Sequence, residues 1–278
     1  MTLDAIVHAT SLIKPKETHR VILQSETARV EVDEKLGGRL SSLRIDGLEI
    51  LVARERNPLA WGCYPMAPWA GRVRNGRFRF VETDYVLPLR MPPHAIHGTV
   101  LDRAWNRRSD DSLQIDLGAD WPWRGFARQS FELAETSLRM RLEVHSEDVA
   151  FPASVGWHPW FRRRLGLGDE LAVAWQADSI YVTDGAGIPT GEKRSPGSGP
   201  FDDCFTDLRG DPILRWVGAI ELTLSSSFDH WVIFDEPDHA ICVEPLSGPP
   251  DALNIAPRLV APGQPLIGEF RIDWRLYR

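Results

Sequence analysis

Two residues, His158 and Glu244, have the types and the settings expected of a proton donor and a proton acceptor. His158 lies in the aromatic segment GWHPWF, residues 156–161, and histidine is the side chain best suited to proton transfer near neutral pH. Glu244 ends the apolar run ICVE, residues 241–244, where burial would raise the pKa of the carboxyl group and make it a useful base. The plain alternatives are a hydrogen-bonded core histidine and an exposed glutamate at a strand end.

A constrained loop supplies a third candidate, Arg72. Residues 65–78, PMAPWAGRVRNGRF, place prolines and glycines around this arginine before a turn and a strand. An arginine held there can present a planar fork of donors to hydroxyls or carboxylates. The alternative is that Arg72, Arg74 and Arg77 are solvated surface charges, which we favour for Arg77 and not for Arg72.

Two histidines three residues apart, His94 and His97, lie in the segment PHAIHG, residues 93–98. The spacing would suit a metal, but no accompanying carboxylate or cysteine pattern supports zinc. We therefore expect no metal site here. A purely structural role is the alternative, and it describes His94.

Aromatic residues are abundant, with eleven tryptophans in the chain. Their faces pack in cores and also stack against the C–H faces of sugars. Core packing is the better interpretation for most of them. Trp157 and Trp160 flank His158, and we expect both to line a pocket.

The composition excludes several classes of partner. The chain of 278 residues is 43% hydrophobic and 26% charged, with a net charge of −7. That charge argues against a nucleic-acid partner, because phosphate binding needs a basic face. No apolar run approaches the roughly 20 residues of a membrane span, and residues 5–13 make a poor signal peptide. We expect a cytoplasmic protein, monomeric or homodimeric.

Cysteines give no framework for disulfides or metal. Cys63, Cys204 and Cys242 are odd in number and far apart, without a CxxC pair. Patterns for dinucleotides, nucleoside triphosphates or zinc are also missing from the sequence. We therefore expect no cofactor.

The elements that must position these residues are short strands. Apolar and polar residues alternate, as in half-buried strands, over residues 28–32, 113–117, 138–144, 171–175, 220–224, 231–234 and 270–274. Turn formers separate them, at Gly37-Gly38, Asp46-Gly47 and Asn75-Gly76 and over residues 184–200. The pattern predicts an all-β fold, a large antiparallel β-sandwich, forming one domain over residues 1–278. We expect residues 184–200 to be a long functional loop near the site.

In this order the motifs resemble one family, the galactose mutarotase-like aldose 1-epimerases, over nearly the whole chain. The shared marks are GRVxxGxF at 71–78, HG at 97–98, HPxF at 158–161, IPTGE at 188–192, FDDxF at 201–205, and EP at 244–245 with PDAxN at 250–254. Two positions depart from the family pattern. Asp203 stands where many members have histidine, and GWHPWF replaces the NHPYFN of galactose-active members, so the sugar is open.

The resemblance implies a large β-sandwich with its site in a cleft on a concave face. It implies that Glu244 is the general base, His158 the general acid and His97 a second active-site histidine. It further implies that Arg72 and Asp202 bind substrate hydroxyls. The partner would be a small monosaccharide.

The chemistry of mutarotation asks for the same residue types. One group removes the proton of the C1 hydroxyl and another delivers a proton to the ring oxygen, so that the hemiacetal opens to an aldehyde. Rotation and reclosure then give the other anomer. Acid and base must lie within about 3 Å of their atoms.

Three other functions remain open from the sequence. A hexose-6-phosphate mutarotase would share the fold and would need a cationic pocket, to which Arg72, Arg74 and Arg39 could contribute. A sugar-binding module or sensor would keep the cleft without turnover. A glycoside hydrolase would need two carboxylates, with Asp202 and Glu244 as candidates, and would leave the histidines without a purpose.

Overall fold

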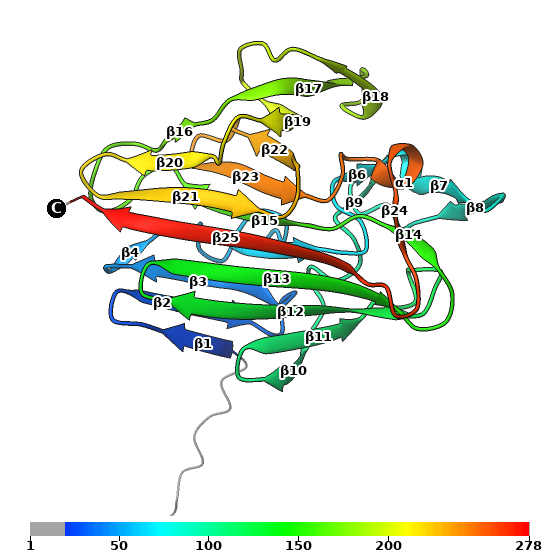
Figure 1. Cartoon of the computed structure of the whole chain (residues 1–278), viewed down its shortest axis with the longest axis horizontal. Helices are drawn as coiled ribbons and strands as arrows, with labels where there is room; N and C mark the ends of the chain where they lie inside the picture. Colours follow the sequence, from blue (N-terminus) through cyan, green and yellow to red (C-terminus); the bar gives the residue numbers. More distant parts are fainter. Residues whose placement is uncertain (1–19, 278) are drawn as a thin grey trace, which may run out of the picture.

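The computed structural model describes residues 20–277, and these residues form two large antiparallel sheets packed face to face (Figure 1). The segment 5–13 lies outside the described residues. The prediction of an all-β antiparallel fold is confirmed, and the strand expected at each of the seven alternating segments is present. Within residues 20–277, no helix has the length and apolar character needed to cross a membrane.

The larger sheet has the strand order β1-β2-β3-β5-β15-β23-β22-β19-β17-β18, with β4 paired to β3. Its strands are β1 (Arg20–Gln24), β2 (Ala28–Asp33), β3 (Arg39–Ile45), β4 (Leu48–Glu49), β5 (Cys63–Met66), β15 (Gly156–Arg162), β17 (Ala177–Thr183), β18 (Pro189–Arg194), β19 (Asp202–Leu208), β22 (His230–Phe234) and β23 (Ala240–Leu246).

The smaller sheet has the order β10-β11-β12-β13-β25-β21-β20-β16. Its strands are β10 (Asn106–Ser109), β11 (Ser112–Asp116), β12 (Gly125–Ala134), β13 (Ser137–Ser146), β16 (Ala172–Ala174), β20 (Ile213–Trp216), β21 (Ile220–Ser226) and β25 (Leu266–Leu276).

Short paired elements complete the fold at one end of the sandwich (Figure 1). They are β6 (Arg72–Val73) with β9 (Ala95–Ile96), β7 (Arg77–Phe80) with β8 (Thr83–Val86), and β14 (Phe151–Ala153) with β24 (Arg258–Val260). A 3₁₀ turn, η1 (Arg74–Gly76), and a short helix, α1 (Ala252–Ile255), lie among them.

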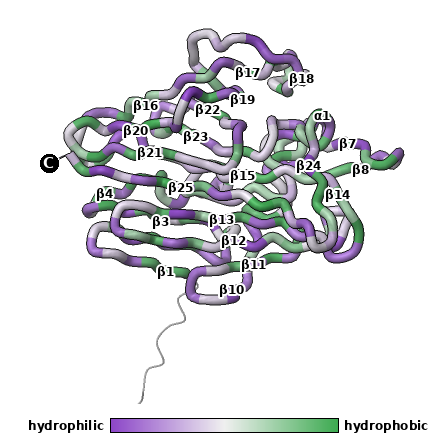
Figure 2. The backbone as a smooth tube through the Cα atoms, viewed as in Figure 1, coloured by the Kyte–Doolittle hydropathy of each residue, from purple (hydrophilic) through white to green (hydrophobic). Residues whose placement is uncertain are grey.

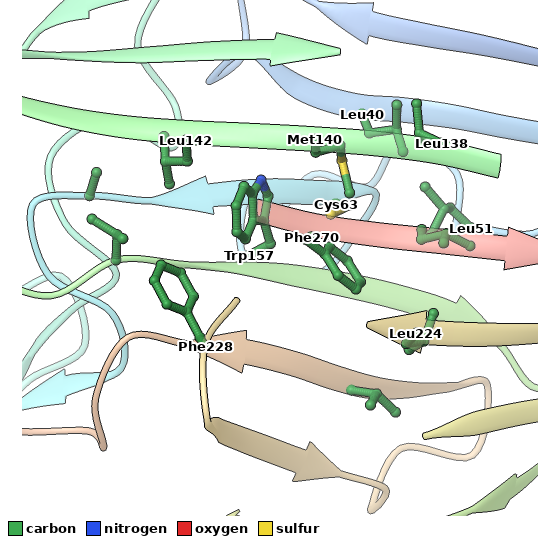
Figure 3. Close-up of a cluster of buried hydrophobic side chains, with 14 of the residues drawn as sticks. Leu40, Leu51, Cys63, Leu138, Met140, Leu142, Trp157, Leu224, Phe228 and Phe270 are labelled. Atoms are coloured by element: carbon green, nitrogen blue, oxygen red, sulfur yellow. The ribbon is translucent and has the colours of Figure 1, made fainter. Parts of the chain in front are cut away.

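Alternation along the strands builds the core between the two sheets. On β13, Leu138, Met140 and Leu142 are fully buried, and the arginines between them face outward. Trp157 of β15 meets Phe270 of β25 at a ring-centroid distance of 5.8 Å. Figure 3 shows these side chains filling the space between the sheets, and Figure 2 shows hydrophilic and hydrophobic residues alternating along the strands of the smaller sheet.

Two central strands of the larger sheet differ from this pattern. Residues 156–161 of β15 and all of β23 are buried on both faces. One face packs in the core, so the other face must be covered by something else. The loops and short elements that cover it leave the pocket described below.

The segment 184–200 is not the single long loop that we expected. It contains β18, an edge strand paired with β17, because the residues from Pro189 to Arg194 can satisfy their backbone hydrogen bonds against β17. A short turn joins the two strands and a second stretch, 195–201, leads into β19.

Candidate active site

One face of the larger sheet forms the floor of a pocket of about 220 Å³. Because side chains on a strand alternate between faces, every second residue of five neighbouring strands points into it. These residues are Tyr64 of β5, His158 and Trp160 of β15, Glu244 of β23, Val232 and Phe234 of β22, and Asp202 and Cys204 of β19. The volume lies below that of drug-sized pockets, about 300–1,000 Å³, and suits a small ligand.

His158 and Glu244 form a cross-strand pair at the centre of this floor. The register of β15 against β23 is set by the pairs Gly156 with Leu246 and Trp160 with Cys242, so His158 falls opposite Glu244. His158 Nε2 lies 3.3 Å from Glu244 Oε1. Their exposed fractions are 6% and 3%, so both groups are desolvated.

Aromatic rings fix the orientation of His158. Its ring stacks on Trp160 with a centroid distance of 5.3 Å and an interplanar angle of 10°, and Tyr64 lies 4.8 Å away on the other side. Tyr64 is itself held because its hydroxyl donates to the carbonyl of Leu59. His158 Nδ1 is buried and has no hydrogen-bond partner among residues 20–277.

His97 approaches the pair from the loop that covers the floor. Its ring lies 5.1 Å from that of His158 in an edge-to-face arrangement. The backbone N–H of Gly71 donates to His97 Nδ1 at 3.2 Å, so the neutral ring carries its hydrogen on Nε2 and can donate it to a ligand. His97 adopts a left-handed φ of 57°, and at Gly98 a Cβ would lie 1.9 Å from the carbonyl oxygen of Ala67, so only glycine fits there.

Arg72 and Asp202 face each other across the mouth of the pocket. Arg72 Nη2 donates to Asp202 Oδ2 at 2.9 Å, joining β6 to β19. Both side chains are partly exposed, at 26% and 36%. The pair therefore offers a donor fork and a carboxylate to a ligand that enters.

Burial shifts the pKa values of the three deepest groups. It holds the pKa of Glu244 well above its usual range, and the negative charge of Asp202 adds to this effect. It lowers the pKa of His158 to about 3, with a further contribution from the positive charge of Arg39. It also holds the pKa of His97 well below its usual range, with the charge of His158 opposing protonation as well. Burial thus disfavours the charged forms of both His158 and Glu244, so a proton held by this pair is favoured on Glu244.

The prediction that Trp157 lines the pocket is wrong. Trp157 is fully buried, donates from Nε1 to Gln129 Oε1 at 3.0 Å and packs in the core. It neighbours His158 in sequence, and strand alternation sends the two side chains to opposite faces. Trp160, two residues after His158, does line the pocket.

Two of the arginines considered for a phosphate pocket are already engaged. Arg39 is fully buried, and its guanidinium donates to the carbonyls of Leu36, Pro58, Trp61 and Leu101. Arg74 pairs with Asp184 at 2.6 Å. His94 has the structural role expected of it, since its Nδ1 accepts the backbone N–H of Asn75, and Arg77 is exposed on β7 as expected.

Sequence reasoning missed Tyr64, which lines the pocket, and Cys242, which lies beside His158 and Glu244 without lining it. Both lie in runs that look like ordinary core, CYPM and AICV, and only the pairing of β5, β15 and β23 brings them beside His158. Cys242 matters because His158, Cys242 and Glu244 each offer a ligand atom, all within 4.8 Å of one another. This trio is the set of residues that could hold a metal ion among residues 20–277.

The turn between β17 and β18 forms one wall of the pocket through Thr183, Gly187 and Pro189. Asp184 holds this turn, because its Oδ1 accepts the backbone N–H groups of Ala186 and Ile188. The residues 196–198 instead border a separate hollow beside Trp175. The first part of the expected loop is thus at the site, and its glycine- and serine-rich part is not.

Arg74 fixes the position of this wall, so we expect Arg74→Gln to weaken ligand binding while leaving the chemical step intact. Its partner is Asp184, whose pKa falls to about 2 because Arg74 donates a hydrogen bond to it. An exposed ion pair stabilises a turn only modestly, so KM for the ligand should rise by up to about fivefold. Arg74→Lys should restore KM, and Arg77→Gln is the matched control. An equal rise in Arg77→Gln, or a fall in kcat instead of a rise in KM, would contradict this role.

Comparisons with known proteins give the following similarities. A family model described as aldose 1-epimerase matches residues 20–253. The uncharacterized protein YihR of Escherichia coli (strain K12) is 26% identical over 252 residues, covering 79% of this chain and 81% of that protein. A crystal structure of a putative aldose 1-epimerase from Escherichia coli K12 has a TM-score of 0.80 at 20% identity, covering 93% of this chain and 99% of that one. Galactose 1-epimerase from Lactobacillus acidophilus NCFM has a TM-score of 0.77 at 17% identity, covering 92% and 94%.

Proposed function

The chain belongs to the aldose 1-epimerase family, and from this premise we propose that it is a mutarotase that interconverts the α and β anomers of an unphosphorylated aldose. The observation that carries the proposal is the buried pair of His158 and Glu244, 3.3 Å apart on the floor of a small pocket. O1 and O5 of a pyranose are both bonded to C1, so an acid and a base must act at nearly the same place. A cross-strand pair meets that requirement.

Burial favours the proton on Glu244, so the proposed reaction begins when this proton passes to His158 across their 3.3 Å contact and leaves Glu244 ionised. Glu244 removes the proton of the C1 hydroxyl, while His158 delivers its proton to the ring oxygen and the C1–O5 bond breaks. Rotation about C1–C2 exposes the other face of the aldehyde. Reclosure returns the proton of the ring hydroxyl to His158 and a proton from Glu244 to O1, so the enzyme ends as it began.

Other groups of the pocket would hold the sugar during this exchange. His97 carries its hydrogen on Nε2 and can donate to a ring or hydroxyl oxygen, supporting charge as the hemiacetal opens. Arg72 and Asp202 can exchange their mutual contact for contacts to hydroxyls. Trp160, on the same face as His158, offers an aromatic surface to C–H groups.

The pairing of the arginines favours an unphosphorylated sugar over a hexose 6-phosphate. A phosphate would need a cation free to meet it. Arg39 is saturated by carbonyls, and Arg74 and Arg72 pair with Asp184 and Asp202. Binding a phosphate would therefore require an existing ion pair to break.

The test is anomer-resolved NMR exchange across a panel of aldoses and their 6-phosphates, with sugar binding followed separately by calorimetry. We expect catalysed exchange of at least one neutral aldose, and exchange of its 6-phosphate that is slower by at least about tenfold, equivalent to about 1.4 kcal/mol. Binding without exchange for every sugar would identify a binding module or sensor. Faster exchange of the 6-phosphates would mean that the substrate is a sugar phosphate and not a neutral aldose. Release of an alcohol from a glycoside would identify a hydrolase.

A further inference from the structure

The acid–base pair has a third neighbour that mutarotation does not use, the thiol of Cys242. Cys242 lies two residues before Glu244 on β23 and opposite Trp160 of β15. Ligand atoms of His158, Cys242 and Glu244 all lie within 4.8 Å of one another. A nitrogen, a sulfur and a carboxylate oxygen thus lie close together between β15 and β23, beside the pocket.

Among residues 20–277, no side chain of another residue hydrogen-bonds to the imidazole of His158, the thiol of Cys242 or the carboxyl group of Glu244. His158 Nδ1 is buried without a partner. Because buried polar groups are normally satisfied, these three neighbouring groups are candidates for binding a ligand together.

The distances match those of a zinc site. Zinc binds imidazole nitrogen and carboxylate oxygen at about 2.1 Å, and at a tetrahedral angle two such ligand atoms lie roughly 3.4 Å apart. His158 Nε2 and Glu244 Oε1 are 3.3 Å apart. A thiolate at about 2.3 Å from the same ion would lie roughly 3.6 Å from the nitrogen. The sulfur of Cys242 lies within 4.8 Å of the other two ligand atoms, so it would have to move by about 1 Å at most.

We propose that His158, Cys242 and Glu244 bind a zinc-class divalent cation, and that the bound cation blocks the sugar site. Three protein ligands leave a fourth position, which faces the pocket and would hold water. As the metal–sulfur bond forms, the thiol proton of Cys242 and the proton shared by the pair leave to solvent. The cation then occupies both groups that the proposed mutarotation needs, so inhibition should be competitive with the sugar and reversible by a chelator.

The direct test uses Co²⁺ alone as a spectroscopic probe of the purified full chain. We expect one equivalent of Co²⁺ to bind with a thiolate-to-cobalt charge-transfer band and with visible bands of tetrahedral intensity, and we expect Zn²⁺ to displace it. In Cys242→Ser the charge-transfer band should vanish and Zn²⁺ affinity should fall by at least about 100-fold. Cys204→Ser is the matched control, since Cys204 is buried beside the same pocket but is not one of the three ligands.

Two results would overturn the metal site. One is the absence of a 1:1 complex with a thiolate band in the unaltered chain. This measurement does not depend on whether any variant folds. The other is a band that persists in Cys242→Ser or disappears in Cys204→Ser. Glu244→Gln provides a second variant, which should keep the thiolate band and lose affinity.

Only the inhibitory part of this proposal rests on the proposed function. If the chain binds Co²⁺ through Cys242 but exchanges no anomers, the metal site stands and the mutarotase proposal fails. If it exchanges anomers and Zn²⁺ does not inhibit below millimolar concentration, the mutarotase proposal stands and the blocking of the sugar site by the cation is wrong. In Cys242→Ser, exchange should stay within about twofold of the original rate, and its inhibition by Zn²⁺ should weaken in parallel with affinity.

Discussion

Glu244→Gln should lower kcat for anomer exchange by about 10²–10⁴-fold, the contribution typical of one positioned acid or base. Glutamine keeps the size of glutamate and one acceptor oxygen, so the packing of β23 and the contacts to bound sugar should change little. It cannot accept the proton of the C1 hydroxyl. The loss should therefore fall on kcat, with KM nearly unchanged.

Stability gives an independent check on this variant. The folded pKa of Glu244 lies above its value of 4.5 in a model compound because the group is buried. A carboxyl group with a raised pKa in the folded state makes folding less favourable as pH rises above 4.5. Glutamine removes that effect, so Tm at pH 7–8 should be equal or higher than before substitution.

The matched control is Glu143→Gln, a strand glutamate of β13 that bonds Arg141 and His145 in the smaller sheet. It should retain exchange and lose a little stability. Near-normal exchange in Glu244→Gln would remove the base assignment and favour the binding-module alternative. A large loss of Tm in that variant would mean that Glu244 stabilises the fold. That result would contradict the stability argument drawn from its burial.

Much of the fold could be predicted because most strands have one buried face and one solvent-exposed face. In β13, apolar Leu138 and Met140 alternate with Arg139 and Arg141, and burial follows the same alternation. The central strands give no such signal. In β15 the residues 156–161 are all buried, so nothing in the sequence tells which face each side chain takes.

That ambiguity explains the error at Trp157. Trp157 directly precedes His158 in sequence, and Trp160 lies two residues after it. The sequence gives no reason to treat these two large aromatic residues differently. The pairing of β15 with β5 and β23 decides that His158 and Trp160 share the pocket face. Trp157 faces Phe270 in the core instead, and pairing between strands distant in sequence is not encoded in a local pattern.

The sequence also could not show which arginines are free to meet a ligand. In the hexose-6-phosphate alternative, Arg39 could contribute to a cationic pocket. Its guanidinium is in fact buried beside the rings of Trp61 and Tyr64 and satisfied by backbone carbonyls. Burial of this kind depends on a carbonyl arrangement that only the folded loops create. Arg39 therefore acts at a distance, as a fixed positive charge that helps to hold the pKa of His158 low.

His158→Asn should reduce exchange by a similar factor, about 10²–10⁴-fold, because the ring oxygen loses its proton donor. Asparagine can still hydrogen-bond in the pocket but does not deliver a proton. His94→Asn is the matched control, because His94 is buried outside the floor and its side chain bonds only the backbone N–H of Asn75 among the contacts described. It should keep kcat, whatever its effect on Tm.

The double variant Glu244→Gln with His158→Asn decides whether the two residues act as one unit. In the proposed mechanism one proton passes between them across a 3.3 Å contact, and neither completes the exchange alone. Losses in kcat should then not multiply, and the double variant should be only a few-fold slower than either single variant. Saturation-transfer NMR measures the three rates, and calorimetry confirms that each variant still binds sugar. If the losses multiply to the product of the single effects, the two residues stabilise the transition state independently, and the shared-proton mechanism is wrong.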